Sequence, residues 1–422
     1  MRVLILGAGV TGLTTAHALA AEGHAVTVVD AEPKVGHGAS FANGGQLSYS
    51  YVAPFAGPGV IGKVPGWLRD PDGPLRFRPQ ADPGQWKWLL AFLRACNAST
   101  AEQTTRRLLL LGYLSRDLLR DLARREGLDF AFAPAGKLVL QPSAGAMEGA
   151  KRQMALQQAW GTVQRALSRE QCVGLEPALA GIAHRIAGGV LTESEDAGDC
   201  RLFCEGLAAK LTRSNAAVTF QLGTRVTQII RAEWRVRGVM TSAGVIEADA
   251  VVLALGTGAR ALARPLGLDL PIYPLKGYSL TLPITREDAA PRISVTDTAQ
   301  KVVYARIGRN LRVAGMADVV GYSPLIEEKR LSTLVSQARA AFPDATDWRD
   351  LNPWAGLRPA TPTGLPILGR APGMGGLYFN LGHGSLGFTL AMGSAAILAA
   401  EIAGREPPIP LDGFELDARC AS

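Results

Sequence analysis

The chain has 422 residues, of which 47% are hydrophobic, and it carries a formal net charge of +7. This length predicts two or three domains, and the positive charge suits anionic substrates or an anionic membrane surface. Basic residues are scattered singly or in pairs, which excludes the concentrated basic stripe of a nucleic-acid-binding protein.

The five cysteines form no C-x-x-C pair and have no metal-ligand spacing. We therefore expect no metal site, and a sparse, odd set of cysteines favours a reducing, cytoplasmic compartment. The N-terminal apolar run is short and enters a glycine loop directly, so no signal peptide is expected. The sequence contains no unbroken run of about 18 apolar residues, so no transmembrane helix is expected.

The first thirty residues predict a strand, a glycine loop, a helix and a second strand, at 3–6, 7–12, 14–22 and 25–29. This is the order of a dinucleotide-binding βαβ unit. Gly7 permits the tight turn, Gly9 lets the backbone approach a pyrophosphate, and Gly12 lets the helix pack close to the strand. Asp30 follows the second strand and can bind the adenosine ribose, which disfavours the 2′-phosphate of NADP.

Two later segments repeat the combination of a buried strand with a glycine-rich turn. Residues 250–255 are apolar and lead into Gly256-Thr257-Gly258, and residues 377–381 lead into a Gly-rich turn before an apolar helix at 388–402. The loop at 36–51 is expected to lie beside the same cofactor. Three such segments favour FAD over NAD, although a nicotinamide dehydrogenase and a non-catalytic FAD-binding subunit remain alternatives.

The remaining predicted elements alternate between helices and strands. Helices are expected at 85–96, 101–126, 146–161, 168–173, 201–213 and 325–341. Strands are expected at 136–141, 186–191, 217–221, 226–233, 237–241, 244–249, 271–284, 301–307 and 310–315. Residues 54–83 are rich in Pro and Gly and are expected to wrap the surface.

With these elements in place, the sequence resembles the FAD-dependent oxidoreductases of the D-amino-acid oxidase and glycine oxidase superfamily. Within that superfamily it is most similar to the bacterial D-amino-acid dehydrogenases of small-subunit type. The resemblance spans nearly the whole chain and rests on VLILGAGVTGL at 3–13, ANGGQLS at 42–48, GDCRLF at 198–203, YPLKGYSLTLPI at 273–284, GLRPATPTGLPILG at 356–369 and LGHGSLGFTLAMGSA at 381–395. Gly45 stands where the family usually has Ala, which is a small departure.

The resemblance implies an α/β fold with two domains. A discontinuous, Rossmann-like FAD-binding domain would comprise residues 1–55, 190–270 and 350–404. A substrate domain with a mixed β-sheet and helices would comprise 56–189 and 271–349, followed by a tail at 405–422.

The implied chemistry is oxidation of a D-amino acid. A hydride passes from Cα to N5 of non-covalently bound FAD, and water converts the imino acid to a 2-oxo acid and ammonia. The implied electron acceptor is a quinone or another respiratory-chain component. The alternatives are an oxygen-using oxidase of D-amino acids or secondary amines, and an FAD subunit of a larger amine dehydrogenase complex.

A buried cation is needed to bind the substrate carboxylate, and Arg provides a planar, bidentate fork. Arg306, Arg312 and Arg358 are the candidates. The resemblance favours Arg306, because the substrate Arg of the family lies on a substrate-domain strand in a similar context. Arg358 comes just before the C-terminal flavin segment and is expected near the flavin or in a structural role. Tyr278 is expected to add a hydrogen bond to the carboxylate, and Tyr51 to belong to a loop that covers the pocket.

His383, between two glycines, is expected first as a flavin-contacting residue and second as a base. Hydride transfer needs no side-chain base if the substrate amine loses its proton on entering a desolvated pocket. The residues expected to contact FAD are Gly7, Ala8, Gly9, Val10, Thr11, Gly12, Asp30, Ala31, Ser40, Asn43, Gly44, Gly45, Gln46, Val226, Leu255, Gly256, Arg358, Gly382, His383, Gly384, Ser385, Leu386 and Gly387.

Residues 59–69 (GVIGKVPGWLR) mix apolar side chains with Lys63 and Arg69, as an interfacial membrane patch does. A peripheral contact with the cytoplasmic face of the inner membrane is therefore one expectation, and an ordinary surface loop is the other. The oligomeric state is left open.

Overall fold

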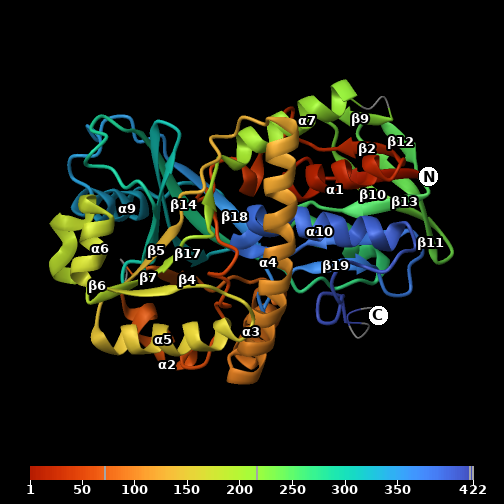
Figure 1. Ribbon diagram of the computed structural model, residues 1–422. Coiled ribbons are helices and arrows are strands. Elements are labelled where there is room, and N and C mark those ends of the chain that lie inside the picture. The colour runs from red at the N-terminus through yellow and green to blue at the C-terminus, as the bar shows by residue number, and fades with distance from the viewer. Residues whose placement is uncertain (71–72, 215–216, 418–419, 421–422) are drawn as a thin grey trace.

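A computed structural model describes residues 1–70, 73–214, 217–417 and 420, with only the backbone of residues 63, 65, 67–69 and 214. Two sheets lie side by side, and in Figure 1 a long helix crosses the front of the molecule where they meet. We refer to them as the six-stranded sheet and the nine-stranded sheet.

The six-stranded sheet has the order β19-β20-β13-β1-β2-β9, and every neighbouring pair is parallel except β19 with β20. Its strands are β1 (Arg2–Leu6), β2 (Ala25–Val29), β9 (Val218–Gln221), β13 (Ala250–Leu253), β19 (Ile367–Arg370) and β20 (Leu377–Leu381). This sheet contains all three strands that the sequence predicted next to glycine-rich turns.

Both faces of the six-stranded sheet are covered, which explains the continuous apolar run in β1. Val3 and Ile5 pack on the side of helices α1 (Val10–Ala21), α7 (Cys200–Ser214) and α10 (Gly387–Ile402). Leu4 and Leu6 pack on the opposite side, against a small antiparallel sheet and a short helix. That opposite cover comprises β10 (Val226–Ala232), β11 (Arg235–Thr241), β12 (Gly244–Glu247) and α8 (Ala259–Ala263). The three strands confirm those predicted at 226–233, 237–241 and 244–249.

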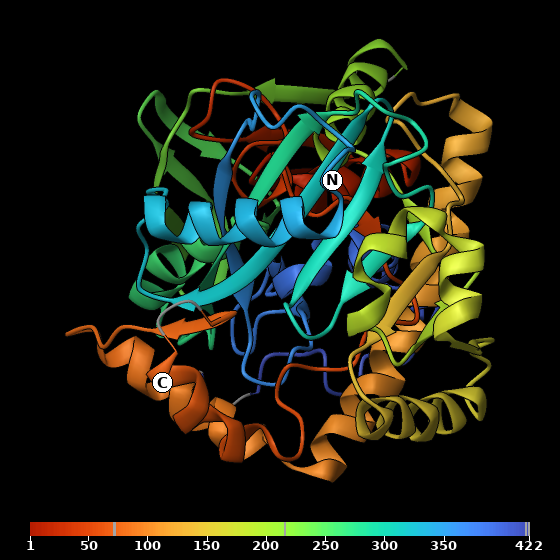
Figure 2. The ribbon, with the colours of Figure 1, turned by 90° about the vertical axis from the view of Figure 1, so that its left-hand side faces the viewer.

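The nine-stranded sheet is mixed and has the order β18-β14-β17-β16-β15-β5-β7-β6, with β4 paired to β17. Its strands are β4 (Leu75–Phe77), β5 (Lys137–Gln141), β6 (Arg165–Ser168), β7 (Gly188–Thr192), β14 (Tyr273–Pro283), β15 (Ser294–Asp297), β16 (Val302–Ile307), β17 (Asn310–Val319) and β18 (Trp354–Ala360). Helix α9 (Glu328–Ala341) lies across one face of this sheet, as Figure 2 shows. A two-stranded ladder, β3 (Gln46–Leu47) with β8 (Asp196–Ala197), lies apart from both large sheets.

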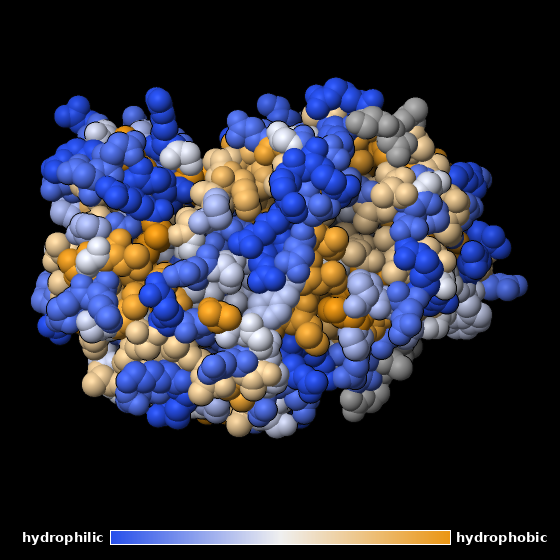
Figure 3. All heavy atoms as spheres, in the orientation of Figure 1, coloured by the Kyte–Doolittle hydropathy of each residue, from blue (hydrophilic) through white to orange (hydrophobic). Residues whose placement is uncertain are grey.

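Helix α4 (Ala98–Glu126) packs against α10 and stands upright between the two halves of the molecule (Figure 1). Its outer face forms a hydrophilic band in Figure 3 and carries both signs of charge, with Arg125 paired to Asp121 and Arg116 to Asp117. The remaining helices are α2 (Val60–Arg69), α3 (Pro83–Ala95), α5 (Ala144–Gln158) and α6 (Arg169–Leu175).

Among the described helices, the stretch Gly384–Ile402 is long and apolar enough to cross a membrane by length and composition. In the structure it packs between α1 and α4, with 67% of its most apolar window buried inside the protein. The apolar helix predicted at 388–402 is therefore a core helix of this fold.

Three features differ from the sequence-based expectations. β7 and β18 belong to the nine-stranded sheet, although 190–270 and 350–404 were both expected in the FAD-binding domain. Residues 60–69 form a helix rather than a loop. The side chains of Lys63, Trp67 and Arg69 lie outside the described part of the structure, so the membrane patch predicted at 59–69 stays a prediction.

Candidate active site

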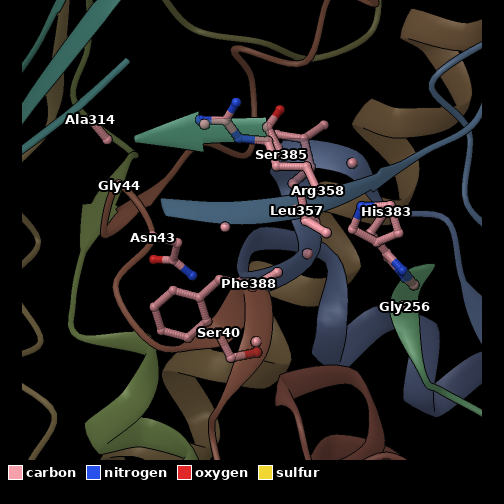
Figure 4. A pocket seen from close by; sticks show the side chains of 18 of the residues that line it. Ser40, Asn43, Gly44, Gly256, Ala314, Leu357, Arg358, His383, Ser385 and Phe388 are labelled. Atoms are coloured by element: carbon pink, nitrogen blue, oxygen red, sulfur yellow. The ribbon is translucent and has the colours of Figure 1, made fainter. Parts of the chain in front are cut away.

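A cavity of about 780 Å³ extends from the glycine loop after β1 to the strands β14, β17 and β18. Figure 4 shows that side chains from distant parts of the chain, including Ser40, Asn43, Arg358 and His383, surround one space. A cavity of this size, lined by segments of both sheets, can hold a large cofactor together with a small substrate.

The glycine loop has the geometry that the sequence predicted. Gly7 has φ +114°, and a Cβ there would lie 2.5 Å from the carbonyl oxygen of Ala254. A Cβ on Gly12 would lie 1.9 Å from the carbonyl oxygen of Gly7, so only glycine allows α1 to begin this close to β1. Gly9 lines the cavity at the N-terminus of α1, where backbone N–H groups favour an anion.

Asp30 also lines the cavity, at the end of β2. Its Oδ2 accepts a hydrogen bond from the N–H of Ala8 at 2.7 Å, and its Oδ1 accepts one from the N–H of Glu32 at 2.9 Å. The carboxylate is therefore held in a fixed orientation beside the glycine loop. Its predicted contact with an adenosine ribose remains a prediction.

The loop at 42–46 is fastened to the nine-stranded sheet by two side chains. Ser279 Oγ donates to the carbonyl of Ala42 at 2.6 Å, and Arg312 Nη1 donates to the carbonyl of Asn43 at 2.5 Å. Arg312 is buried and also pairs with Asp199 at 3.1 Å, so this candidate arginine has a structural role. The loop backbone is thereby fixed along the cavity wall.

Arg358 is the arginine that the structure brings to the cavity. It lies on β18, and its Nη1 donates to the carbonyl of Met316 at 2.8 Å. Met316 has φ +65°, next to a bulge where β17 pairs with β14 between Lys276 and Tyr278. Such backbone strain is concentrated at functional sites. A Cβ on Gly277 would lie 2.1 Å from Arg358 Nη2, so this glycine leaves the space that the guanidinium occupies.

Tyr278 and Tyr51 line the same cavity, in agreement with their predicted place in a pocket. Tyr278 is only 1% exposed, and its hydroxyl has no hydrogen-bond partner among the described residues. Burial, followed by the charge of Asp318, raises the pKa of Tyr278 to about 12, so the hydroxyl stays protonated and can donate. This hydroxyl is therefore available to donate a hydrogen bond to a group in the cavity.

Arg306 is not brought to the cavity, which corrects its choice as the carboxylate-binding residue. Its side chain points to the loop before β15, where Nε donates to the carbonyl of Pro291 at 3.1 Å and Nη2 to that of Glu287 at 2.8 Å. It also pairs with the carboxylate of Glu287. The reason is strand parity: neighbouring side chains alternate between faces, and the Arg306 side chain lies on the face away from the cavity.

His383 is 3% exposed, and its Nε2 lies 3.0 Å from Ser394 Oγ. Burial lowers the pKa of His383 to about 3, so the imidazole is neutral at physiological pH. A neutral ring bonded to a core hydroxyl fits a wall of the site better than a proton-accepting base.

The structure brings together most residues that were predicted to contact the cofactor. Those that line the cavity are Gly7, Gly9, Val10, Thr11, Asp30, Ser40, Asn43, Gly44, Gly45, Gln46, Leu255, Gly256, Arg358, His383, Gly384, Ser385, Leu386 and Gly387. The predicted residues that do not line it are Ala8, Gly12, Ala31, Val226 and Gly382.

Lining residues that the sequence analysis did not select include Glu32, Ser48, Lys137, Met316 and Trp354. The sequence did contain a signal for Lys137, because a charged residue at the start of the apolar strand GKLVLQ indicates a special role for that residue. Met316 had none, because its place depends on the bulge in β17.

Comparison with known proteins agrees with this geometry. The family model described as FAD-dependent oxidoreductase (DAO) matches residues 2–401. The chain belongs to this family. The D-amino acid dehydrogenase 2 of Ralstonia nicotianae is 49% identical to this DAO-family protein, covering 99% of this chain and 100% of that protein. The D-amino acid dehydrogenase 2 of Pseudomonas aeruginosa is 47% identical, covering 98% of this chain and 97% of that protein.

Solved structures with the same fold include glycine oxidase from Geobacillus kaustophilus. It has a TM-score of 0.78 at 21% identity and covers 98% of both chains. The L-proline dehydrogenase from P. horikoshii has a TM-score of 0.77 at 17% identity, covering 98% of this chain and 96% of that chain.

The residues of this DAO-family protein fit FAD. The N-terminus of α1 offers N–H groups for the pyrophosphate. The Asp30 carboxylate lines the cavity beside them and can accept hydrogen bonds from ribose hydroxyls. At the other end of the cavity, Gly384 has φ +56°, and a Cβ there would meet no heavy atom within 4 Å. The chain thus has an open, glycine-lined cradle where a flat ring system can lie against backbone.

Proposed function

We propose that this protein is an FAD-dependent D-amino acid dehydrogenase, which converts D-amino acids to 2-oxo acids and ammonia. The observation that carries the proposal is the position of Arg358 and Tyr278 in the wall of the same cavity as the glycine-lined cradle. The names of the relatives at 49% and 47% identity support the choice of substrate class.

Arg358 would bind the substrate carboxylate through its planar fork, and the Tyr278 hydroxyl would donate a further hydrogen bond. These two contacts orient Cα–H within the cavity. Bound FAD supplies the acceptor for the hydride that leaves Cα. Neutral His383 would take no proton from the substrate amine, which would instead enter the desolvated cavity as the free base.

Arginine variants test this assignment on the isolated protein, with an artificial dye as electron acceptor and a panel of D-amino acids. Two charge-assisted bonds are worth roughly 1.5–3 kcal/mol each. Arg358→Ala should therefore lower kcat/KM by on the order of 10²–10⁴ with FAD still bound, and Arg358→Lys should recover part of it. Arg306→Ala is the matched control and should retain near-normal kcat/KM. If Arg306→Ala lost kcat/KM while Arg358→Ala kept it, Arg306 would be the residue that binds the substrate carboxylate.

For the electron acceptor we propose a quinone or another respiratory-chain component, rather than oxygen. Support comes from the relatives named as dehydrogenases. Turnover should be fast with a quinone analogue or a dye and slow with oxygen. Equal or faster turnover with oxygen would favour the alternative, an oxidase.

A peripheral membrane contact is a further part of the proposal. Several apolar side chains face solvent, with Phe55 44%, Ile61 51% and Leu325 74% exposed, and Phe55 also lines the cavity. Cosedimentation with anionic liposomes should therefore remove the protein from the supernatant. Equal recovery with and without vesicles would end this part of the proposal.

A further inference from the structure

Lys137 is a buried cation in the wall of the cavity that the chemistry above leaves unused. It is the first residue of β5, it is 3% exposed, and it lines the cavity together with Ser48 and Tyr51. Its strand lies between β15 and β7, so its backbone is held on both sides. The position of the side chain is therefore set by the sheet rather than by a mobile loop.

The ammonium group of Lys137 has polar contacts but no ion pair. Its Nζ donates to Ser48 Oγ at 2.7 Å and lies 4.3 Å from the centroid of the Tyr51 ring. Among the described residues, no carboxylate forms an ion pair with it. An ammonium has three donors, and Ser48 accepts from one of them, so even if the Tyr51 ring takes a second, one remains for a group in the cavity. Buried charges are normally paired or fully hydrogen-bonded, and Lys137 has room for such a partner only on its cavity side.

Glu195 is the acidic group whose charge acts on Lys137, although the two form no ion pair among the described residues. The Glu195 side chain is fully buried, and its Oε1 accepts a hydrogen bond from the N–H of Ser50 at 2.7 Å. Burial lowers the pKa of Lys137, and the charge of Glu195 opposes this by raising it. The carboxylate therefore favours the ammonium form, while the third donor of Lys137 stays free.

We infer that Lys137 binds a second carboxylate, carried by the side chain of an acidic D-amino acid such as D-glutamate or D-aspartate. The inference rests on the proposed function, in which Arg358 takes the α-carboxylate. Both cations line one cavity, while the lining carboxylates Asp30 and Glu32 lie at the glycine-loop end. A substrate with two carboxylates would satisfy both cations, whereas a neutral side chain leaves Lys137 unpaired.

The test compares D-glutamate with its neutral isostere D-glutamine in the flavin-loaded protein. The wild type should have the higher kcat/KM for D-glutamate. Lys137→Met should lower the D-glutamate to D-glutamine ratio by about ten- to hundredfold, the size of one charge-assisted hydrogen bond. Lys137→Arg keeps the charge and should retain most of the ratio. Lys87→Met removes an exposed lysine outside the cavity and should leave the ratio unchanged.

D-alanine separates side-chain binding from a role in the common reaction. In Lys137→Met, kcat/KM for D-alanine should fall at least tenfold less than kcat/KM for D-glutamate. An equal loss on D-alanine and D-glutamate would overturn the inference, and so would an unchanged D-glutamate to D-glutamine ratio. If the wild type oxidised no D-amino acid at all, the proposed function would fail instead.

Inhibitor binding to the wild type keeps the inference testable if Lys137→Met does not fold. Glutarate and its monoamide differ only in the second carboxylate, and each can be followed through the absorbance of the bound flavin. Glutarate should bind at least tenfold more tightly. Equal affinity for the two would overturn the second carboxylate site, whatever the protein oxidises.

Discussion

Gly277 and Arg358 lie on the neighbouring strands β14 and β18, and the absence of a side chain at Gly277 creates the space for the Arg358 guanidinium. A Cβ at Gly277 would lie 2.1–2.4 Å from the guanidinium atoms. The arginine is thereby held flat against the sheet, with its Nη1 bonded to the carbonyl of Met316. One glycine thus determines where the proposed carboxylate-binding group stands.

Gly277→Ala should therefore impair activity without removing the cofactor. The guanidinium is the flexible end of a long side chain, so it should move while the sheet stays intact. We expect a loss in kcat/KM of on the order of 10–10² on D-alanine, up to the loss of one charge-assisted bond. Flavin absorbance should stay at the wild-type ratio. Gly145→Ala, in α5 with open space around it, is the control and should keep normal activity.

Asp30→Ala should weaken retention of FAD. The variant loses the proposed ribose contact and the bond to the N–H of Ala8, each a charge-assisted bond worth roughly 1.5–3 kcal/mol. Asp30→Asn retains one acceptor and should lose less. The measurement is the ratio of flavin to protein after extensive dialysis. Full occupancy in Asp30→Ala would show that this carboxylate does not bind the cofactor.

His383 should make the folded state sensitive to acid. An unfolded histidine takes up a proton near pH 6.5, whereas burial lowers the pKa of His383 in the folded state to about 3. Between these values the unfolded state binds more protons, so the free energy of unfolding falls by about 1.4 kcal/mol per pH unit as the pH decreases. Denaturant unfolding from pH 7.5 to 5.5 should show a smaller decline in His383→Gln. Parallel curves for the two proteins would contradict this.

Selectivity for D-glutamate over D-glutamine should fall as the pH rises through about 8. Burial lowers the pKa of Lys137 to about 8, and the titratable groups that face it are Glu195 and Tyr51. The ammonium binds a carboxylate, and the free amine above that pH does not. Titration of the substrate amine affects both amino acids alike and cancels in the ratio. Lys137→Arg should show a flat ratio between pH 7 and 9.

Local sequence patterns predicted most helices, strands and turns, because these elements depend on residues that are close together in the sequence. The order of strand, glycine loop, helix and acid at 3–30 specifies the first βαβ unit, and the apolar run of α10 specifies a core helix. The allocation of β7 and β18 to a sheet was not predictable in this way. Which sheet a strand joins depends on pairing with distant strands, such as β18 with β14.

The site shows the same division. Glycines and Asp30 were found because backbone conformation and loop spacing identify them. Choosing among Arg306, Arg312 and Arg358 required knowing which face of a strand each occupies. Arg306 is taken up by carbonyls of the 287–291 segment, and Arg312 by Asn43 and Asp199. Those partners lie up to 269 positions away, beyond the reach of periodicity.

The placement of β20 and α10 has a consequence for biosynthesis. β20 joins the six-stranded sheet beside β13, and α10 covers α1, so the cradle behind the glycine loop is assembled from both ends of the chain. A nascent chain that has not reached residue 377 holds the pyrophosphate loop but lacks the turn at 382–387. Cofactor loading therefore follows the synthesis of nearly the whole polypeptide. Until α10 has been synthesised, the face of α1 that packs against α10 in the folded protein stays uncovered.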